Sequence, residues 1–268
     1  MTKPHIAVVG AGIIGICSAY FLNKSGFKVT LIDKSEPGSM TSYGHACTFA
    51  DYACIPVNSP DLFREIPSML LRSDGPLAVD FLYTIKNLSW VLKFLQNCTT
   101  EKVKYISNSL GNLLNNASTS YDEIFSDVDV SQYIKNEEAL YLFENENEFL
   151  KASITNKTRE KNGVKIKTLS KNEILELEPN LAPVFFNGQL FIGSRHTTDP
   201  LSVSKKIFES CINNGGKFVK NNVENIIPNE SKVTVSYKNE NFSFDKVVIS
   251  AGSWSKILTR KFGDDLPL

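Results

Sequence analysis

The stretch His5-Ile-Ala-Val-Val-Gly-Ala-Gly-Ile-Ile-Gly-Ile-Cys-Ser-Ala-Tyr-Phe-Leu-Asn-Lys-Ser-Gly-Phe-Lys-Val-Thr-Leu-Ile-Asp33 decides the fold of this chain. Its residues 5–9 form a β-branched apolar run that is typical of a buried parallel strand. A Gly-rich turn follows, and a predicted helix then runs to Lys24, with Gly26 just past its end. Residues 27–32 predict the next strand, with Asp33 at its end. The stretch therefore predicts a strand–helix–strand unit.

The three glycines of the turn have separate physical roles. Gly10 permits a tight turn, Gly12 lets the backbone approach a pyrophosphate, and Gly15 allows the helix to pack closely on the strand. The start of the helix offers free N–H groups and a positive dipole end to phosphates. Asp33 can accept both hydroxyls of an adenosine ribose and would repel a 2′-phosphate, which disfavours NADP. This arrangement predicts a dinucleotide-binding unit.

The regular βα alternation of an NAD-binding domain does not continue after Asp33. A polar, small-residue segment follows, and then two apolar stripes at helical spacing (residues 81–95 and 103–124), which we expect to face the core. The pattern resumes at Asp199-Pro200 with a helix start and then strands at 217–220, 233–237, 242–244 and 246–249. A nucleotide domain that is interrupted and resumed is expected of proteins that bind FAD.

We therefore predict an α/β fold with a Rossmann-like FAD-binding domain interrupted by an α+β substrate domain. The expected boundaries place the FAD-binding domain in residues 1–56 and 196–256. The helical and substrate-domain insertion covers 57–195, and 257–268 begins a further substrate-domain segment, so that the chain is expected to be C-terminally truncated.

Composition excludes several classes of protein. Lys+Arg and Asp+Glu balance at 29 each, which gives no basic surface for nucleic acid. The 5 cysteines show no CxxC spacing, so neither a disulfide framework nor a metal site is expected, and a reducing, cytoplasmic location fits best. No apolar run approaches the roughly 20 residues that a spanning helix needs.

Five motifs together resemble a known family: VVGAGIIG…LID, TSYGHA, LSKNEILELEP, TTDPLSVSKKIFESCINNGGKFV and DKVVISAGSWS. They resemble the D-amino-acid oxidase superfamily of FAD-dependent oxidoreductases, and within it the small-subunit type of bacterial D-amino acid dehydrogenase. The resemblance runs along almost the whole chain. The cofactor-binding residues that it implies are Gly10, Ala11, Gly12, Ile13, Ile14, Gly15, Asp33, Lys34, Thr41, Ser42, His45, Ala46, Val223, Ala251, Gly252 and Trp254.

His45 is the most chemically suggestive side chain in the middle segment. The dehydrogenase type usually has Asn here and Gly two residues on, where this chain has His45 and Cys47. In similar dimethylglycine-type enzymes a histidine in such a segment is bonded to the flavin. Two roles therefore stay open for His45: a covalent link to the cofactor, or a hydrogen bond to the cofactor or the backbone.

The resemblance implies oxidation of the C–N bond of an amine or a D-amino acid by hydride transfer to flavin. The product is an imine, and then a keto acid and ammonia. It assigns no catalytic side chain in this chain. A quinone is the expected electron acceptor, with peripheral contact at the inner face of the cell membrane as an open expectation. The alternatives are an oxidase of glycine or sarcosine type that uses oxygen, and a non-catalytic FAD-binding fragment. An NAD-dependent dehydrogenase is disfavoured.

Overall fold

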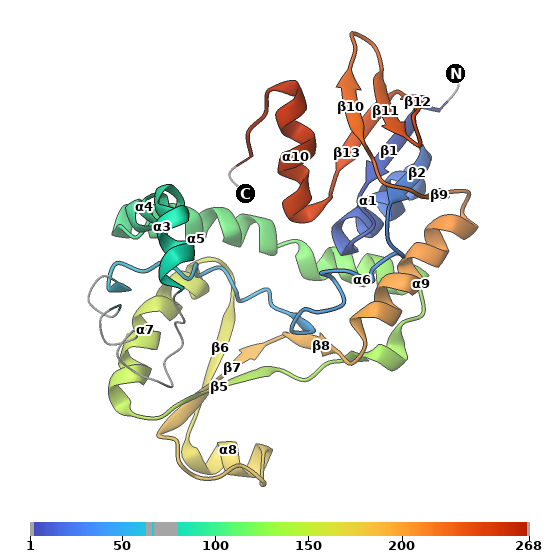
Figure 1. The fold of residues 1–268 in the computed structure, drawn as a ribbon. Helices are drawn as coiled ribbons and strands as arrows, with labels where there is room; N and C mark the ends of the chain where they lie inside the picture. Colours follow the sequence, from blue (N-terminus) through green and yellow to red (C-terminus); the bar gives the residue numbers. More distant parts are fainter. Residues whose placement is uncertain (1–2, 63–65, 67–79, 267–268) are drawn as a thin grey trace. The chain divides into compact units, whose positions relative to one another are not determined.

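The computed structural model describes residues 3–62, 66 and 80–266, and its contacts divide the chain into two compact units (Figure 1). Unit 1 comprises Met1–Thr48, Asp122–Lys135 and His196–Leu268. Unit 2 comprises Phe49–Tyr121 and Asn136–Arg195.

Unit 1 is built on a parallel sheet of four strands in the order β13-β1-β2-β9. The strands are β1 (His5–Val9), β2 (Lys28–Asp33), β9 (Lys217–Lys220) and β13 (Lys246–Ile249). Val8 lies between Leu31 on β2 and Val248 on β13. Both Val8 and Leu31 are buried, which explains why this part of the sequence is a continuous apolar run.

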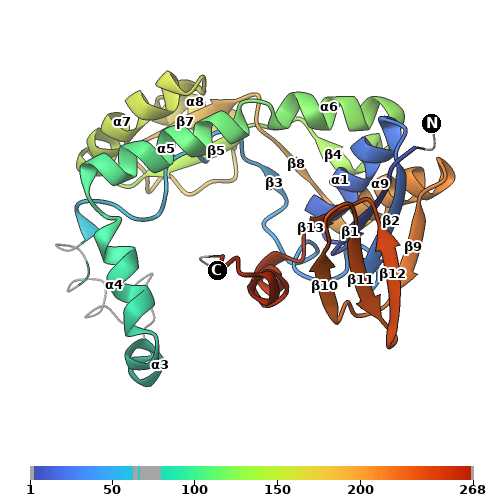
Figure 2. The same cartoon turned by 90° about the horizontal axis from the view of Figure 1, so that it is seen from above.

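Each face of this sheet is covered by a different layer. Helix α1 (Ile13–Lys24) packs against β1, β2 and α9 (Pro200–Asn213). On the opposite face, Ala7 and Ile32 form a core cluster with Val235, Tyr237 and Phe244. These three residues belong to an antiparallel sheet of β10 (Asn225–Pro228), β11 (Val233–Tyr237) and β12 (Glu240–Phe244), seen beside β1 and β2 in Figure 2.

The sheet of unit 2 consists of three antiparallel strands in the order β5-β7-β6. They are β5 (Ala139–Phe143), β7 (Asn187–Ile192) and β6 (Lys165–Leu169). Helix α7 (Glu146–Lys161) covers one face, where the amide of Asn156 donates to Gln189 Oε1 at 2.7 Å. Helix α8 (Lys171–Leu177) contributes Ile174 to a separate core cluster with Leu169 and Phe185.

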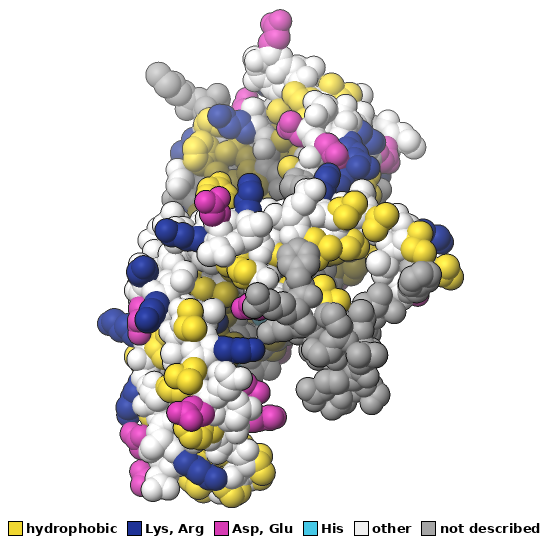
Figure 3. All heavy atoms as spheres, turned by 90° about the vertical axis from the view of Figure 1, so that its left-hand side faces the viewer, with side chains coloured by type: hydrophobic (Ala, Val, Ile, Leu, Met, Phe, Trp, Pro, Cys, Tyr) yellow, Lys and Arg dark blue, Asp and Glu magenta, His cyan; other side chains and the backbone are white. Residues whose placement is uncertain are grey.

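Unit 2 also carries α3 (Phe81–Lys86), α4 (Leu88–Gln96) and α5 (Thr100–Leu114). The first apolar stripe was expected to face the core, but Ile85, Leu88 and Leu92 are exposed, so that prediction is wrong for these described residues. Helix α4 has no buried residue. Figure 3 views the side of Figure 1 on which α3 and α4 lie and shows apolar side chains at the surface among charged ones.

Helix α6 (Ala117–Asp127) carries the end of the second stripe, and its Ile124 is buried as expected, whereas Leu113 of the same stripe, in α5, is exposed, so the prediction is wrong for Leu113. Within unit 1 the Asp127 carboxylate accepts from Tyr20 Oη at 2.5 Å and from Lys24 Nζ at 2.7 Å, which fastens α6 to α1. The remaining short elements are β3 (Thr48–Phe49), η1 (Ser131–Tyr133), β4 (Ile134–Lys135), β8 (Arg195–Thr197), η2 (Gly252–Trp254), α10 (Ser255–Thr259) and η3 (Arg260–Phe262). Within the described ranges, the helices are all too short or too polar to cross a membrane.

The structure confirms the predicted α/β class and the strand–helix–strand unit at residues 5–33. Gly26 has φ of +87° just past the end of α1, as expected for a helix terminator. The predicted start of α9 is also confirmed, with Asp199 as N-cap and Pro200 in the first turn. The domain boundaries expected at 56/57, 195/196 and 256/257 stay predictions.

The N-cap of α9 generates a first testable prediction. Asp199 Oδ2 accepts from the Ser202 hydroxyl and Oδ1 from the Ser202 N–H, at 2.5 and 2.9 Å, and these hydrogen bonds lower the pKa of the carboxyl. We expect Asp199→Ala to lower the free energy of unfolding by about 1 kcal/mol, and Asp199→Asn to lower it less, because Asn also caps.

The pH dependence follows from the sign of that shift. A carboxylate whose folded pKa is depressed stabilises the fold above its unfolded pKa, and this contribution is lost as the pH falls through the folded value. Thermal unfolding at about pH 7 and about pH 3 should therefore show the advantage of wild type over Asp199→Asn shrinking in acid. Equal unfolding of wild type and Asp199→Ala at neutral pH would contradict the prediction.

Candidate functional site

A cleft of about 830 Å³ lies in unit 1 at the carboxyl ends of the parallel strands. Its walls come from the segments that follow β1, β2, β9 and β13. Ligands of open α/β sheets bind in the crevice outside the carboxyl ends of the strands, and the volume is within the range of small-molecule sites. This is the place where the sequence predicts a dinucleotide.

The glycine turn forms the floor of the cleft and packs closely against the end of β13 and against the start of α1. Gly10 has φ of +106°, and a Cβ there would lie 2.5 Å from the carbonyl oxygen of Ser250, at the end of β13. A Cβ on Gly15 would lie 1.8 Å from the carbonyl oxygen of Gly10. Both positions are therefore closed to any side chain, and α1 begins directly behind the turn.

The start of α1 presents hydrogen-bond donors to the cleft. The first intrahelical bond runs from Ile16 N–H to Gly12 O at 2.9 Å, so the N–H groups of Ile14 and Gly15 have no acceptor within the helix. The N–H of Ile13 donates to Ser42 Oγ at 2.9 Å. No acidic residue occupies the first turn. The positive end of the helix dipole is thus available to an anion, and Ser42 holds the following segment against it.

Asp33 is fixed by the same turn. Its Oδ2 accepts from Ala11 N–H at 2.7 Å, and its Oδ1 accepts from Ser35 N–H at 2.8 Å. Each carboxylate oxygen has further lone-pair capacity, so both can still accept from neighbouring hydroxyls. The side chain therefore suits the two hydroxyls of a ribose.

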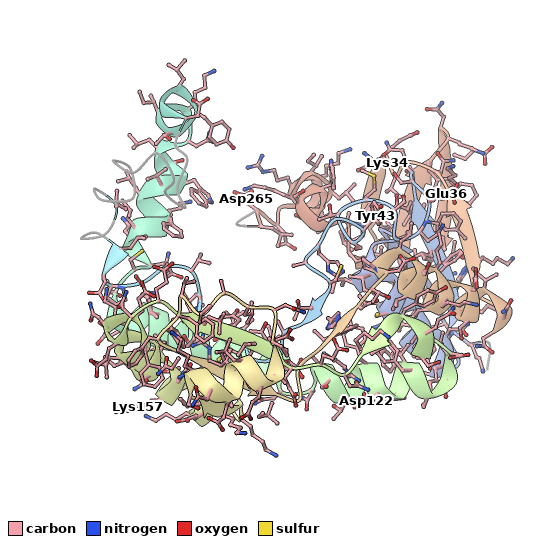
Figure 4. All side chains as sticks on the ribbon, turned by 90° about the horizontal axis from the view of Figure 1, so that it is seen from below. Lys34, Glu36, Tyr43, Asp122, Lys157 and Asp265 are labelled. Atoms are coloured by element: carbon pink, nitrogen blue, oxygen red, sulfur yellow. The ribbon has the colours of Figure 1, made fainter. Side chains whose placement is uncertain are left out.

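Two cations, Lys34 and Lys261, line the cleft. Lys34 Nζ lies 5.0 Å from the ring centroid of Trp254, which is 43% exposed. Lys261 Nζ instead donates to the carbonyl oxygen of Glu224 at 2.5 Å. Figure 4 shows Lys34, Glu36 and Tyr43 along the connection that follows β2. Glu36 pairs with Lys220 at 2.6 Å and does not line the cleft.

His45 lines the cleft with one ring nitrogen already engaged. The backbone N–H of Cys47 donates to His45 Nδ1 at 2.9 Å. A nitrogen that accepts has no proton, so the neutral ring carries its proton on Nε2. Cys47 has φ of +64°, a left-handed conformation that favours glycine, and this explains why the resemblance expects glycine there.

Most of the implied site residues meet in this cleft. Those that line it are Gly10, Gly12, Ile13, Ile14, Asp33, Lys34, Thr41, Ser42, His45, Val223, Ala251, Gly252 and Trp254. Ala11, Gly15 and Ala46 do not line it: Ala11 and Gly15 build the turn beneath, and Ala46 accepts from the Thr48 hydroxyl through its carbonyl oxygen. The assignment of all these residues, inside and outside the cleft, as cofactor-binding residues stays a prediction.

The sequence did not identify the other residues of the walls, which are Val9, Ile32, Met40, Asn221, Asn222, Glu224, Ser250, Ser255, Ile257, Leu258 and Lys261. Asn222, Glu224 and Ser250 are next in sequence to residues that the resemblance implied, so their position beside a motif could have identified them. Ile257, Leu258 and Lys261 come from α10 and η3, where no motif marks them.

The close approach of Gly15 generates the second prediction. We expect Gly15→Ala to weaken the binding of FAD at least about 10-fold, because the new methyl group must push α1 away from the Gly10 carbonyl. Equilibrium dialysis against FAD measures this.

Gly215→Ala is the matched control. Gly215 has φ of +92° and no atom within 4 Å of the added Cβ, so the change costs about 1 to 2 kcal/mol of backbone energy without reshaping the cleft. FAD affinity should survive in this variant. If both variants lose affinity equally, the loss reflects stability and not the glycine turn.

Comparison with known proteins places this geometry in a family. The family described as FAD dependent oxidoreductase (DAO) matches residues 5–268. A D-amino-acid oxidase of Bradyrhizobium diazoefficiens is 30% identical over 98% of this chain and 63% of its own length. A D-amino acid dehydrogenase of Allorhizobium ampelinum is 24% identical over 98% of this chain and 64% of its own length.

A solved structure is similar in fold. The L-alpha-glycerophosphate oxidase of Mycoplasma pneumoniae, with FAD bound, superposes with a TM-score of 0.67 at 20% identity over 99% of this chain and 58% of its own. The chain spans about 63% of the length of the first of these curated relatives. The family match confirms FAD as the predicted cofactor, and the glycine turn, the free helix donors and Asp33 fit it. The chain belongs to the DAO family of FAD-dependent oxidoreductases.

Proposed function

We propose that the protein oxidises the C–N bond of an amine or amino acid, with D-amino acids as the preferred class. The observation that carries this is the cleft of unit 1, whose glycine turn and Asp33 suit FAD. The substrate class is supported by the relatives, which are named D-amino-acid oxidase and D-amino acid dehydrogenase.

The described residues contribute binding and orientation. The N–H groups at the start of α1 and the Ser42 hydroxyl face the place of the diphosphate, and Asp33 faces that of the adenosine ribose. When bound, the flavin supplies the chemistry by accepting a hydride from the carbon next to nitrogen, which leaves an imine that water hydrolyses to a keto acid and ammonia. Ile13, Ile14 and Met40 supply apolar surface to the wall of the same cleft.

A quinone is the proposed electron acceptor, with the protein in the cytoplasm and in contact with the inner face of the membrane. The second candidate is an oxidase that passes electrons to oxygen, which is supported by the 30% identical relative named as an oxidase. These two differ in the acceptor and not in the cleft.

The substrate class is tested with the FAD-loaded chain. In the absence of oxygen, we expect D-amino acids to bleach the flavin absorption, and L-amino acids to bleach it more slowly. Air is then readmitted. Recovery of the flavin colour with release of peroxide indicates the oxidase, whereas recovery only after a quinone is added indicates the dehydrogenase. A chain that holds FAD but is not bleached by any amine or amino acid supports the alternative of a non-catalytic FAD-binding fragment.

The attachment of the flavin is a separate prediction. The backbone N–H of Cys47 already donates to His45 Nδ1, so only Nε2 can interact with the cofactor. We expect Nε2 to donate a hydrogen bond to it. Acid precipitation should therefore release the yellow colour into the supernatant. Colour that stays in the pellet of wild type and is lost in His45→Asn would establish a covalent link through Nε2.

A further inference from the structure

Two side chains from either side of β1 meet over the cleft. Lys34 follows β2, Trp254 lies in the turn after β13, and β1 separates these strands in the sheet. The Lys34 ammonium lies 5.0 Å from the indole centroid. Within residues 3–62, 66 and 80–266, Lys34 has no carboxylate partner. The contact with Trp254 is therefore what positions this cation.

The neighbours of the pair indicate which half of a dinucleotide it meets. Asp33, directly before Lys34, is the residue suited to a ribose, and Val223 follows the strand that pairs with β2. Thr41, Ser42 and His45 lie further along the connection that leads away from Asp33. The pair therefore stands at the adenosine end of the cleft.

We propose that Lys34 and Trp254 form a clasp for the adenosine diphosphate half of FAD, in which adenine replaces the ammonium on the face of Trp254. The displaced ammonium then pairs with the diphosphate. This proposal rests on the assignment of FAD to the cleft and goes beyond it by naming the residues that recognise the base.

The competition for the indole face favours adenine. A cation over an exposed indole is weakly held because water solvates the ammonium, and Trp254 is 43% exposed. A nucleobase that stacks on an aromatic ring gains more binding free energy than an exposed ammonium does, and it has no charge to desolvate. A lysine is also a flexible point charge that can turn from the ring to a phosphate. Lys261 is less suited to this exchange because its ammonium is held by the Glu224 carbonyl oxygen.

The fluorescence of Trp254 can report which group lies against its ring. The chain has 2 tryptophans, and the other, Trp90, lies in α4 of unit 2, outside the cleft. In a Trp90→Phe background the emission therefore comes from Trp254 alone. ADP should quench and shift this emission to saturation. Inorganic pyrophosphate, which lacks the base, should leave it nearly unchanged.

The variants separate stacking from charge. By calorimetry, Trp254→Ala should weaken ADP binding about 10-fold, and Trp254→Phe should retain most of the affinity because a ring remains. Lys34→Gln should weaken ADP about 3-fold or more at low salt, and this difference should disappear at high salt. Far-UV circular dichroism of each variant shows that the fold is retained.

Asp33→Ala distinguishes failure of the clasp from failure of the cofactor assignment. If ADP affinity falls in Asp33→Ala but is equal in wild type and Trp254→Ala, the cleft binds the nucleotide and the clasp is overturned. If ADP binds none of the proteins, including wild type, the clasp and the assignment of the cleft fall together. Unchanged Trp254 emission at saturating ADP also overturns the clasp.

Discussion

The close approach of the Gly15 backbone to the Gly10 carbonyl is the constraint on which the site depends. An added Cβ would stand 1.8 Å from that oxygen, so α1 can begin this close to β1 only without a side chain. The approach brings the free N–H groups of Ile14 and Gly15 to the carboxyl edge of the sheet. At that edge, dipole and donors act together on an anion. Had the helix started further away, the same residues would offer only a solvated helix end.

The carboxylate of Asp33 depends on the same turn. Ala11 N–H can donate to it because the turn brings residues 10–12 beside the end of β2, and the parallel pairing of Val9 with Ile32 sets that register. Gly10 N–H donates to Ile32 O at 2.8 Å and extends the pairing by one step. The Asp33 carboxylate is thus held by backbone N–H groups and not by another charge. Because backbone donors hold Asp33, no lysine has to pair with it, and the Lys34 ammonium lies over the Trp254 ring instead.

The sequence predicted the parts whose physics is local. Residues 5–33 form a continuous pattern of strand, turn, helix and strand, and the helix start at Asp199-Pro200 depends on adjacent residues, so both were confirmed. The core-facing prediction for Ile85, Leu88 and Leu92 was wrong because periodicity shows that a helix has an apolar face but not what covers it. Ile257 and Lys261 join the cleft because α10 and η3 pack beside β10, a long-range arrangement that no local pattern encodes.

The segment around His45 shows strain next to the site. Cys47 adopts φ of +64°, which costs a residue with a Cβ about 1 to 2 kcal/mol relative to glycine. This backbone turn points the Cys47 N–H at His45 Nδ1, and Thr197 N–H in turn donates to the Cys47 carbonyl at 2.8 Å. Two hydrogen bonds thus hold a conformation that the residue disfavours, and their joint effect is to fix one tautomer of a ring that lines the cleft. A glycine there would relieve the strain but would hold the ring less firmly, because a freer backbone loses more entropy in keeping the N–H aimed.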